Sequence, residues 1–147
     1  MTWLRIAFAL LMLAAGGLKL ADIRGFYEVV EAYRLLPELV VPFAAWGIVL
    51  AEVALGFWLA SGRATRAAAN ALIAIHLVYL AWISVAAVRG LSIENCGCFG
   101  VYWPRPLTWQ TFLEDAVLLA LAILLRRFAI DRRTSVPASQ RAPIAPL

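Results

Sequence analysis

Long apolar blocks are the feature that most limits what this chain can fold into. Hydrophobic residues make up 64% of the 147 residues and charged residues only 15%, whereas a soluble domain usually carries about a quarter charged residues. The apolar residues are gathered into blocks instead of recurring at the period of a helix or a strand. Blocks of this kind fit a lipid bilayer as solvent, so the sequence predicts an integral membrane protein.

Four such blocks predict membrane-spanning helices, over residues 3–21, 39–62, 67–88 and 109–130. A helix needs about 20 residues, at about 1.5 Å each, to cross the hydrocarbon core. The second and third blocks meet that length easily, but the first and fourth meet it only if terminal charges such as Lys19 and Asp115 reach the membrane interfaces. We therefore expect an all-α fold, an integral membrane four-helix bundle. A cleavable signal peptide is the alternative for the first block, but Lys19 follows its apolar core too closely.

The segment between the first two blocks, residues 22–37, has apolar side chains at three- and four-residue spacing. They are Phe26, Val29, Val30, Tyr33 and Leu36. This spacing predicts a short amphipathic helix on the outer surface of the bundle, with a polar linker as the alternative. Residues 1–131 then form one domain with four spans. Residues 132–147, rich in proline and small polar residues, are expected to form a disordered cytoplasmic tail.

The positions of lysine and arginine predict how the chain is oriented in the membrane. With four spans, both termini share a side with the loop between the second and third spans, and this side holds most of the 13 basic residues. They are Arg5, Arg63, Arg66, Arg126, Arg127, Arg132, Arg133 and Arg141. Both termini are therefore expected in the cytoplasm, and the loop between the third and fourth spans outside it. The net charge of +4 reflects this signal and not a nucleic-acid-binding face.

The two cysteines of the chain, Cys96 and Cys98, stand together in the run "NCGCFG" of that outer loop. Outside the cytoplasm a dithiol can form and keep a disulfide. A zinc site is disfavoured, because a closed site needs four ligands and the chain adds only His76, which lies far from the loop. A structural disulfide is the other alternative, yet a Cys-x-Cys bridge encloses too little chain to stabilise a fold. We favour a strained, easily reduced bridge that carries electron pairs.

The same loop bears a resemblance to a known family. The run "CGCFG", after an arginine and a glycine at the end of the third span, resembles the MauE family of methylamine-utilisation membrane proteins, which is allied to the DoxX-like proteins. Further matches are "GGLKLADIRGF", "YRLLP", and Glu52 followed by Gly56 in "EVALG". The similarity covers roughly residues 5–130.

The resemblance implies a four-helix protein of the bacterial inner (plasma) membrane that takes part in thiol–disulfide chemistry. Cys96 and Cys98 would exchange electrons with a periplasmic thioredoxin-like partner, for the maturation of a periplasmic dehydrogenase in methylamine metabolism. Because this membrane thiol–disulfide oxidoreductase would lack a second cysteine pair, a membrane quinone or the partner's cysteines would have to substitute. The alternative is a non-catalytic scaffold or chaperone that anchors a periplasmic redox partner. A small-solute transporter is a third, weaker alternative.

Two ionisable residues are expected near the middle of the membrane, Glu52 in the second span and His76 in the third. At about 1.5 Å per residue, both lie roughly 18–20 Å below the outer ends of their helices, so antiparallel neighbours would bring them together. A lone carboxylate at this depth costs roughly 2.5–3.5 kcal/mol on insertion scales, and a histidine partner would offset much of that cost. We expect either a structural pair or an intramembrane proton relay or quinone contact.

Overall fold

The structure, a computed structural model, describes residues 2–129, so the expected tail at 132–147 lies outside the described residues. All regular secondary structure in the described part is helical, without a strand. Its elements are α1 (Thr2–Ala21), α2 (Ile23–Ala32), the short 3-10 helix η1 (Glu38–Val40), α3 (Val41–Ser61), α4 (Thr65–Val88) and α5 (Trp109–Phe128). The predicted all-α class is confirmed, and each predicted span coincides closely with a long helix.

Three helical segments are long and apolar enough to cross a membrane: Thr2–Ala21, Glu38–Ser61 and Thr65–Val88. Many large apolar side chains on them are exposed, as lipid-facing side chains would be. Examples are Leu10, Phe43, Leu50, Phe57, Leu77 and Val78. Helix α5 is of similar length but carries charges near both ends and is not one of the three. The structure therefore supports a membrane protein.

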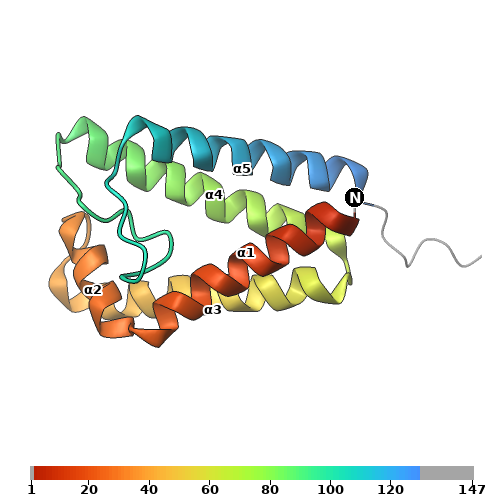
Figure 1. The fold of residues 1–147 in the computed structure, drawn as a ribbon, viewed down its shortest axis with the longest axis horizontal. Helices are drawn as coiled ribbons and strands as arrows, with labels where there is room; N and C mark the ends of the chain where they lie inside the picture. Colours follow the sequence, from red (N-terminus) through yellow and green to blue (C-terminus); the bar gives the residue numbers. More distant parts are fainter. Residues whose placement is uncertain (1, 130–147) are drawn as a thin grey trace, which may run out of the picture.

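The four long helices lie lengthwise beside one another, and α1 packs mainly on α3 while α4 packs mainly on α5 (Figure 1). Glycines allow α1 and α3 to approach closely. A Cβ atom on Gly16 would lie 2.8 Å from the Val53 side chain, and one on Gly56 would lie 2.7 Å from that of Leu13. Small residues have this role between membrane helices generally. The close approach places neighbouring side chains of α1 and α3 in direct contact.

The two ends of the molecule differ. At one end lie the start of α1, the turn between α3 and α4, and the end of α5; at the other lie α2 and the long connection from α4 to α5 (Figure 1). An apolar core joins all four long helices. It contains Phe8, Ala9, Met12, Leu55, Leu59, Ala68, Ala69, Leu72, Ala122 and Leu125. The polar residues described below lie between this core and the end that carries α2.

Helix α2 confirms the expected short helix between the first two long ones, although it ends at Ala32 rather than near Pro37. The Asp22 side chain accepts a hydrogen bond from the backbone N–H of Gly25 at 2.9 Å and so caps its N-terminus. Its apolar face is buried against α3. Phe26, Val29 and Val30 of α2 pack with Val41, Ala45 and Val49 of α3. This packing fixes α2 over one end of the helix pair α1–α3.

Candidate functional site

The connection between α4 and α5 folds back on itself as a hairpin, residues 93–107, with Cys96 and Cys98 at its turn. The backbone N–H of Cys96 donates to the carbonyl of Arg105 at 2.7 Å, and that of Leu107 donates to Ile93 at 2.8 Å. The Asn95 side chain closes the turn, because it accepts from the N–H of residue 97 and donates to the carbonyl of residue 100, both at 3.0 Å. Such local side-chain bonds are what favours asparagine in turns.

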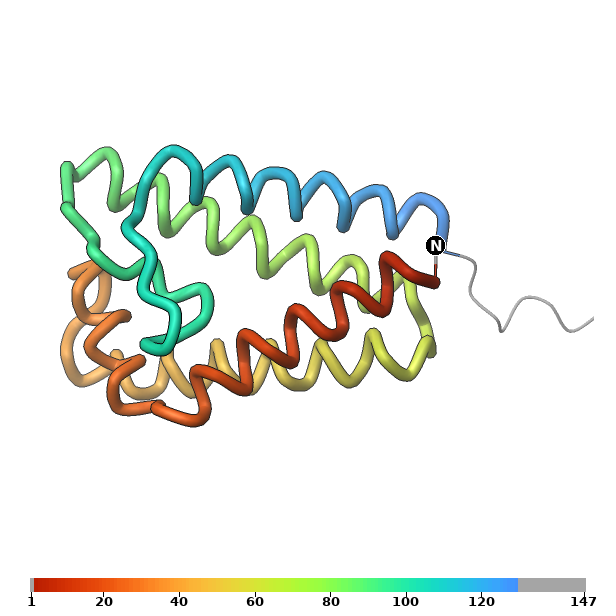
Figure 2. The backbone as a smooth tube through the Cα atoms, viewed as in Figure 1, coloured from red at the N-terminus to blue at the C-terminus, as the bar shows by residue number. Residues whose placement is uncertain are grey.

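The hairpin is docked onto the helices on both sides and reaches across from α4 and α5 to α2 (Figure 2). The Tyr33 hydroxyl donates to the carbonyl of Cys96 at 2.8 Å. Arg105 makes a two-pronged ion pair with Glu114 on α5, at 2.7 and 2.8 Å. Gly97, at φ +79°, lies against Val29 of α2. These contacts therefore hold the cysteines in a fixed position against the helices.

Replacing Gly97 with alanine should release the hairpin from α2. The new Cβ would lie 2.6 Å from Cγ1 of Val29, in addition to the strain of a positive φ, which costs about 1–2 kcal/mol for an L-residue. Gly90→Ala is the matched control, because Gly90 has φ +66° but open space around it. We expect faster maleimide labelling of the thiols in Gly97→Ala than in Gly90→Ala. Adding Val29→Ala should slow it again, and equal labelling in both single variants would contradict the docking.

The two sulfur atoms are not bonded to each other and lie 3.1 Å apart. Cys96 is half-buried and Cys98 is exposed. The hydrogen bond with Cys98 lowers the pKa of Cys96 to about 6, and the positive charges of Arg105 and Lys19 add to this effect. The same hydrogen bond, together with the surrounding protein atoms, raises the pKa of Cys98 well above its ordinary range. The lowered pKa favours the thiolate form of Cys96 near neutral pH, and the raised pKa favours the protonated form of Cys98.

The ionisation of Cys96 can be measured by following thiolate absorbance against pH, in the unmodified protein and in the Cys98→Ala variant. Because its pKa is depressed to about 6, the thiolate should persist as the pH falls and disappear near pH 6 instead of near the usual value of about 8.5. In Cys98→Ala the stabilising hydrogen bond is lost, so the midpoint should move upward. Cys96→Ala is the control and should show no thiolate near pH 6. An unchanged midpoint in Cys98→Ala would rule out the hydrogen bond as the main cause.

Glu52 of α3 is paired with Lys19 of α1, and both side chains are almost completely buried, at 1% and 2% exposure. The Lys19 Nζ lies 2.5 Å from Oε1 of Glu52, and the Tyr79 hydroxyl of α4 donates to the same oxygen at 2.6 Å. The expectation that Lys19 reaches the membrane interface is therefore wrong. Because α1 and α3 approach closely, the buried carboxylate of Glu52 can stabilise the charged amine of Lys19 inside the protein.

His76 of α4 is paired with Asp115 of α5, with Nδ1 of His76 2.6 Å from Oδ1 of Asp115. Both are buried. The expected direct contact between Glu52 and His76 does not form. Glu52 points from α3 toward α1, and His76 points from α4 toward α5. The Asp115 side chain likewise points into the protein, toward His76.

A cavity of about 280 Å³ connects these groups. Its lining includes both cysteines of the hairpin as well as Glu52, His76 and Asp115. The structure thus brings all four candidate residues from the sequence, Cys96, Cys98, Glu52 and His76, around one space, although they are not bonded as expected. Among the described residues there is no group of three or more histidine, cysteine or acidic side chains that could hold a metal ion.

Several residues of this site were not identified as site residues from the sequence: Lys19, Tyr33, Tyr79, Asn95, Arg105 and Asp115. A signal was present for two of them. Lys19 and Asp115 are charges inside or beside apolar blocks, and such charges usually pair with one another across a membrane protein. Tyr33 and Tyr79 gave no comparable signal, since tyrosine is common both in membrane helices and at their ends.

Comparison with known proteins bears on what this site serves. The chain matches the family model described as methylamine utilisation protein MauE over residues 1–127. The chain belongs to the MauE family. The methylamine utilization protein MauE of Paracoccus denitrificans is 35% identical over 136 residues, which cover 92% of this chain and 72% of that protein. The MauE of Paracoccus versutus is 32% identical over 120 residues, covering 82% of this chain and 64% of that protein.

No solved structure matches this MauE-family chain. The resemblance seen in the sequence is confirmed by the family match. The matched region contains the whole site, from Lys19 on α1 through the hairpin to Asp115 on α5. The site described above is therefore part of the region that defines membership of the MauE family, and not an addition at one end of it.

Proposed function

We propose that this MauE-family chain is a membrane thiol–disulfide redox protein that exchanges electrons with a thioredoxin-like partner outside the cytoplasm. The observation that carries the proposal is the fixed pair of unbonded sulfurs 3.1 Å apart, one of them with a pKa of about 6. A dithiol with one thiolate and one protonated thiol is the arrangement that thiol–disulfide exchange requires, because the thiolate attacks and the second thiol resolves the mixed disulfide. The names of its relatives point to methylamine utilisation, where the target would be a periplasmic dehydrogenase.

We further propose that α5 is a fourth membrane span, which completes a four-helix membrane bundle. Its charges are neutralised or lie at its ends: Glu114 pairs with Arg105 in the hairpin, Asp115 pairs with His76, and Arg126 and Arg127 occupy its last turn. A helix of 20 residues is about 30 Å long, which matches the hydrocarbon core of a bilayer. The paired charges explain how this helix can be in the membrane despite its composition.

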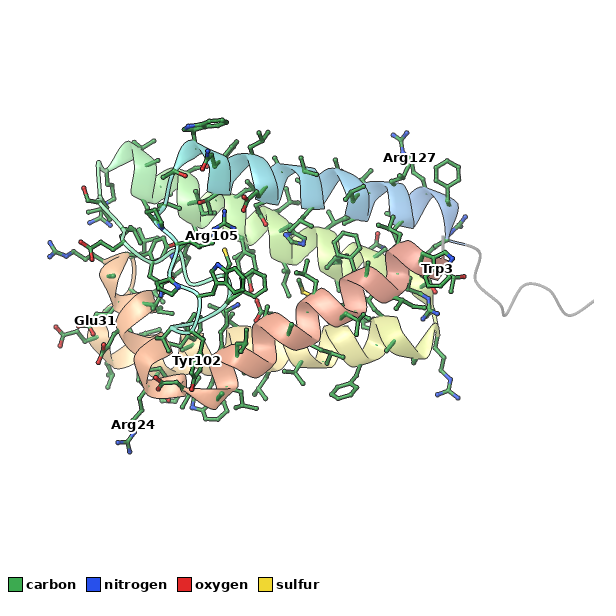
Figure 3. The ribbon with its side chains drawn as sticks, viewed as in Figure 1. Trp3, Arg24, Glu31, Tyr102, Arg105 and Arg127 are labelled. Carbon is green, nitrogen blue, oxygen red and sulfur yellow. The ribbon has the colours of Figure 1, made fainter. Side chains whose placement is uncertain are left out.

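The arrangement of the arginines supports an inner membrane orientation with both termini in the cytoplasm. Figure 3 shows Arg127 at the same end as Trp3 and the start of the chain, and Arg24 and Glu31 at the opposite end with α2. At the first end, Arg5 donates to the carbonyls of Leu59 and Ala60, at the end of α3. Cations there are favourable both for the helix dipole and for the cytoplasmic side of a membrane. The cysteine hairpin then lies on the outer side.

The proposal is tested by labelling the cysteines in intact cells. After mild reduction, a membrane-impermeant maleimide should label Cys96 or Cys98 without permeabilisation, because the hairpin faces outward. Without reduction, a fraction of the protein should resist labelling, because a redox pair cycles through the disulfide. A Cys96→Ser/Cys98→Ser variant is the background control. Labelling that requires permeabilisation would reject the orientation, and a pair that never oxidises would favour the non-catalytic scaffold.

A further inference from the structure

The cavity that both cysteines line also has features of a ligand site, and the inference drawn from them rests on the proposed redox function. We propose that a lipid-soluble quinone binds in this cavity, enters from the bilayer between α3 and α4, and accepts the electrons of the Cys96–Cys98 dithiol. The argument depends on three properties of the cavity: its unpartnered polar atoms, its apolar opening and its contact with the sulfurs.

Three of the residues that line the cavity each carry a buried polar atom without a hydrogen-bond partner among the described residues. These atoms are Oε2 of Glu52, Nε2 of His76 and Oδ2 of Asp115. A buried polar atom without a partner costs about 1–3 kcal/mol, so native proteins leave few of them. Two are carboxylate oxygens, which accept from a hydroxyl, and the third is an imidazole nitrogen, which can donate to a carbonyl or accept from a hydroxyl. The two hydroxyls of a hydroquinone can donate to the carboxylate oxygens, and a carbonyl of the oxidised ring can accept from Nε2 of His76 when this nitrogen carries a proton.

The remaining lining is mostly apolar and reaches the outer surface of the helices. Ile48 of α3 and Trp82 of α4 line the cavity together with Val78, whose side chain is 57% exposed. Helices α3 and α4 pack on each other less extensively than either packs on its main neighbour. Both lie in segments apolar enough to cross a membrane, so an opening between them faces lipid. A ligand that uses this route must be soluble in the bilayer.

The proposed reaction balances without a further reactant. As the bond between the two sulfurs forms, the pair gives up two electrons and the proton that Cys98 carries. The second proton, which Cys96 released to water when it ionised, is taken back from water. The quinone takes both electrons and both protons and leaves as the hydroquinone. The oxidised Cys96–Cys98 pair can then accept electrons from the dithiol of a thioredoxin-like partner. His76 and the two carboxylates, placed at the ring oxygens, are positioned to pass the protons.

The experiment uses the full chain, purified in quinone-free nanodiscs, reduced, and mixed with decylubiquinone in the absence of oxygen. We expect hydroquinone to form in proportion to the thiols that disappear. A parallel sample receives oxidised glutathione, which tests thiol exchange alone. Oxidation by glutathione without oxidation by decylubiquinone would overturn the quinone site and leave the proposed function standing. Failure of both reactions would overturn the proposed function itself, and with it the inference that rests on it.

A matched pair of variants tests where the quinone binds. Val78→Trp places a large ring in the cavity lining, whereas Leu77→Trp places the same ring on the same helix at similar exposure, 52%, outside the lining. We expect the decylubiquinone concentration for half-maximal rate to rise about tenfold, the effect of losing roughly 1.4 kcal/mol of binding, in Val78→Trp and to stay unchanged in Leu77→Trp. Equal values in both variants would place the quinone elsewhere.

His76→Gln gives a second test that does not depend on reshaping the cavity. Glutamine keeps a hydrogen bond but cannot carry a proton. The maximal rate of decylubiquinone reduction should fall, with little change in the half-maximal concentration, while oxidation by glutathione proceeds as before. An unchanged maximal rate would remove His76 from the quinone reaction and contradict the proposed proton path.

Discussion

Replacing Cys98 with serine should trap the partner on Cys96 as a stable mixed disulfide, and replacing Cys96 with serine should trap nothing. The reason is the difference between the two thiols: the pKa of Cys96 is lowered to about 6 while that of Cys98 is raised. Cys96 therefore attacks a disulfide of the partner, and without Cys98 this chain itself has no thiol that can resolve the mixed disulfide. Non-reducing electrophoresis of membranes from cells that express each variant detects the trapped species. Both variants should lose essentially all redox function.

Protein abundance is the control for this experiment. A Cys-x-Cys bridge encloses almost no chain, so its loss should cost little stability, and both serine variants should reach normal levels in the membrane. Reduced abundance with full activity per molecule would favour a structural bridge. A mixed disulfide that forms through Cys98 instead would reverse the roles assigned to the two cysteines.

The second large effect is expected at the buried pair between Lys19 and Glu52. Lys19→Met removes the cation and leaves the carboxylate buried, which should lower the free energy of unfolding by roughly 3–5 kcal/mol. Unfolding in mixed detergent micelles measures this loss. In the double variant Lys19→Met/Glu52→Gln the unpaired charge is gone, and the amide oxygen can still accept from the hydroxyl of Tyr79. We therefore expect the double variant to regain most of the stability.

Arg105→Gln is a useful comparison, because it breaks an ion pair of similar length that is open to solvent. The pair of Arg105 with Glu114 has distances of 2.7 and 2.8 Å, yet exposed pairs contribute little to stability. Arg105→Gln should therefore lower the free energy of unfolding much less than Lys19→Met does. If the Lys19→Met and Glu52→Gln effects simply add in the double variant, the two side chains are not coupled and the observed contact does not stabilise the protein.

Much of the fold could be predicted from the sequence because its signals are local. The length of each apolar block determined the long helices, and the three- and four-residue spacing around Phe26 and Val30 predicted α2. The family was recognisable from short motifs around Cys96 and Cys98, since these depend on the order of residues alone. The end of α2 at Ala32 was not predictable in this way, because Tyr33 is buried by contacts with distant residues and not by the helix period.

The sequence by itself determined that Glu52 and His76 lie in the apolar part of long helices, because position along a helix follows from counting residues. Only the tertiary structure decided their partners. Depth gives one coordinate, but the direction in which a side chain points depends on which helices pack together. Helix α3 packs on α1, so Glu52 meets Lys19; helix α4 packs on α5, so His76 meets Asp115. The same packing leaves the space between the two pairs as the cavity beneath the cysteines.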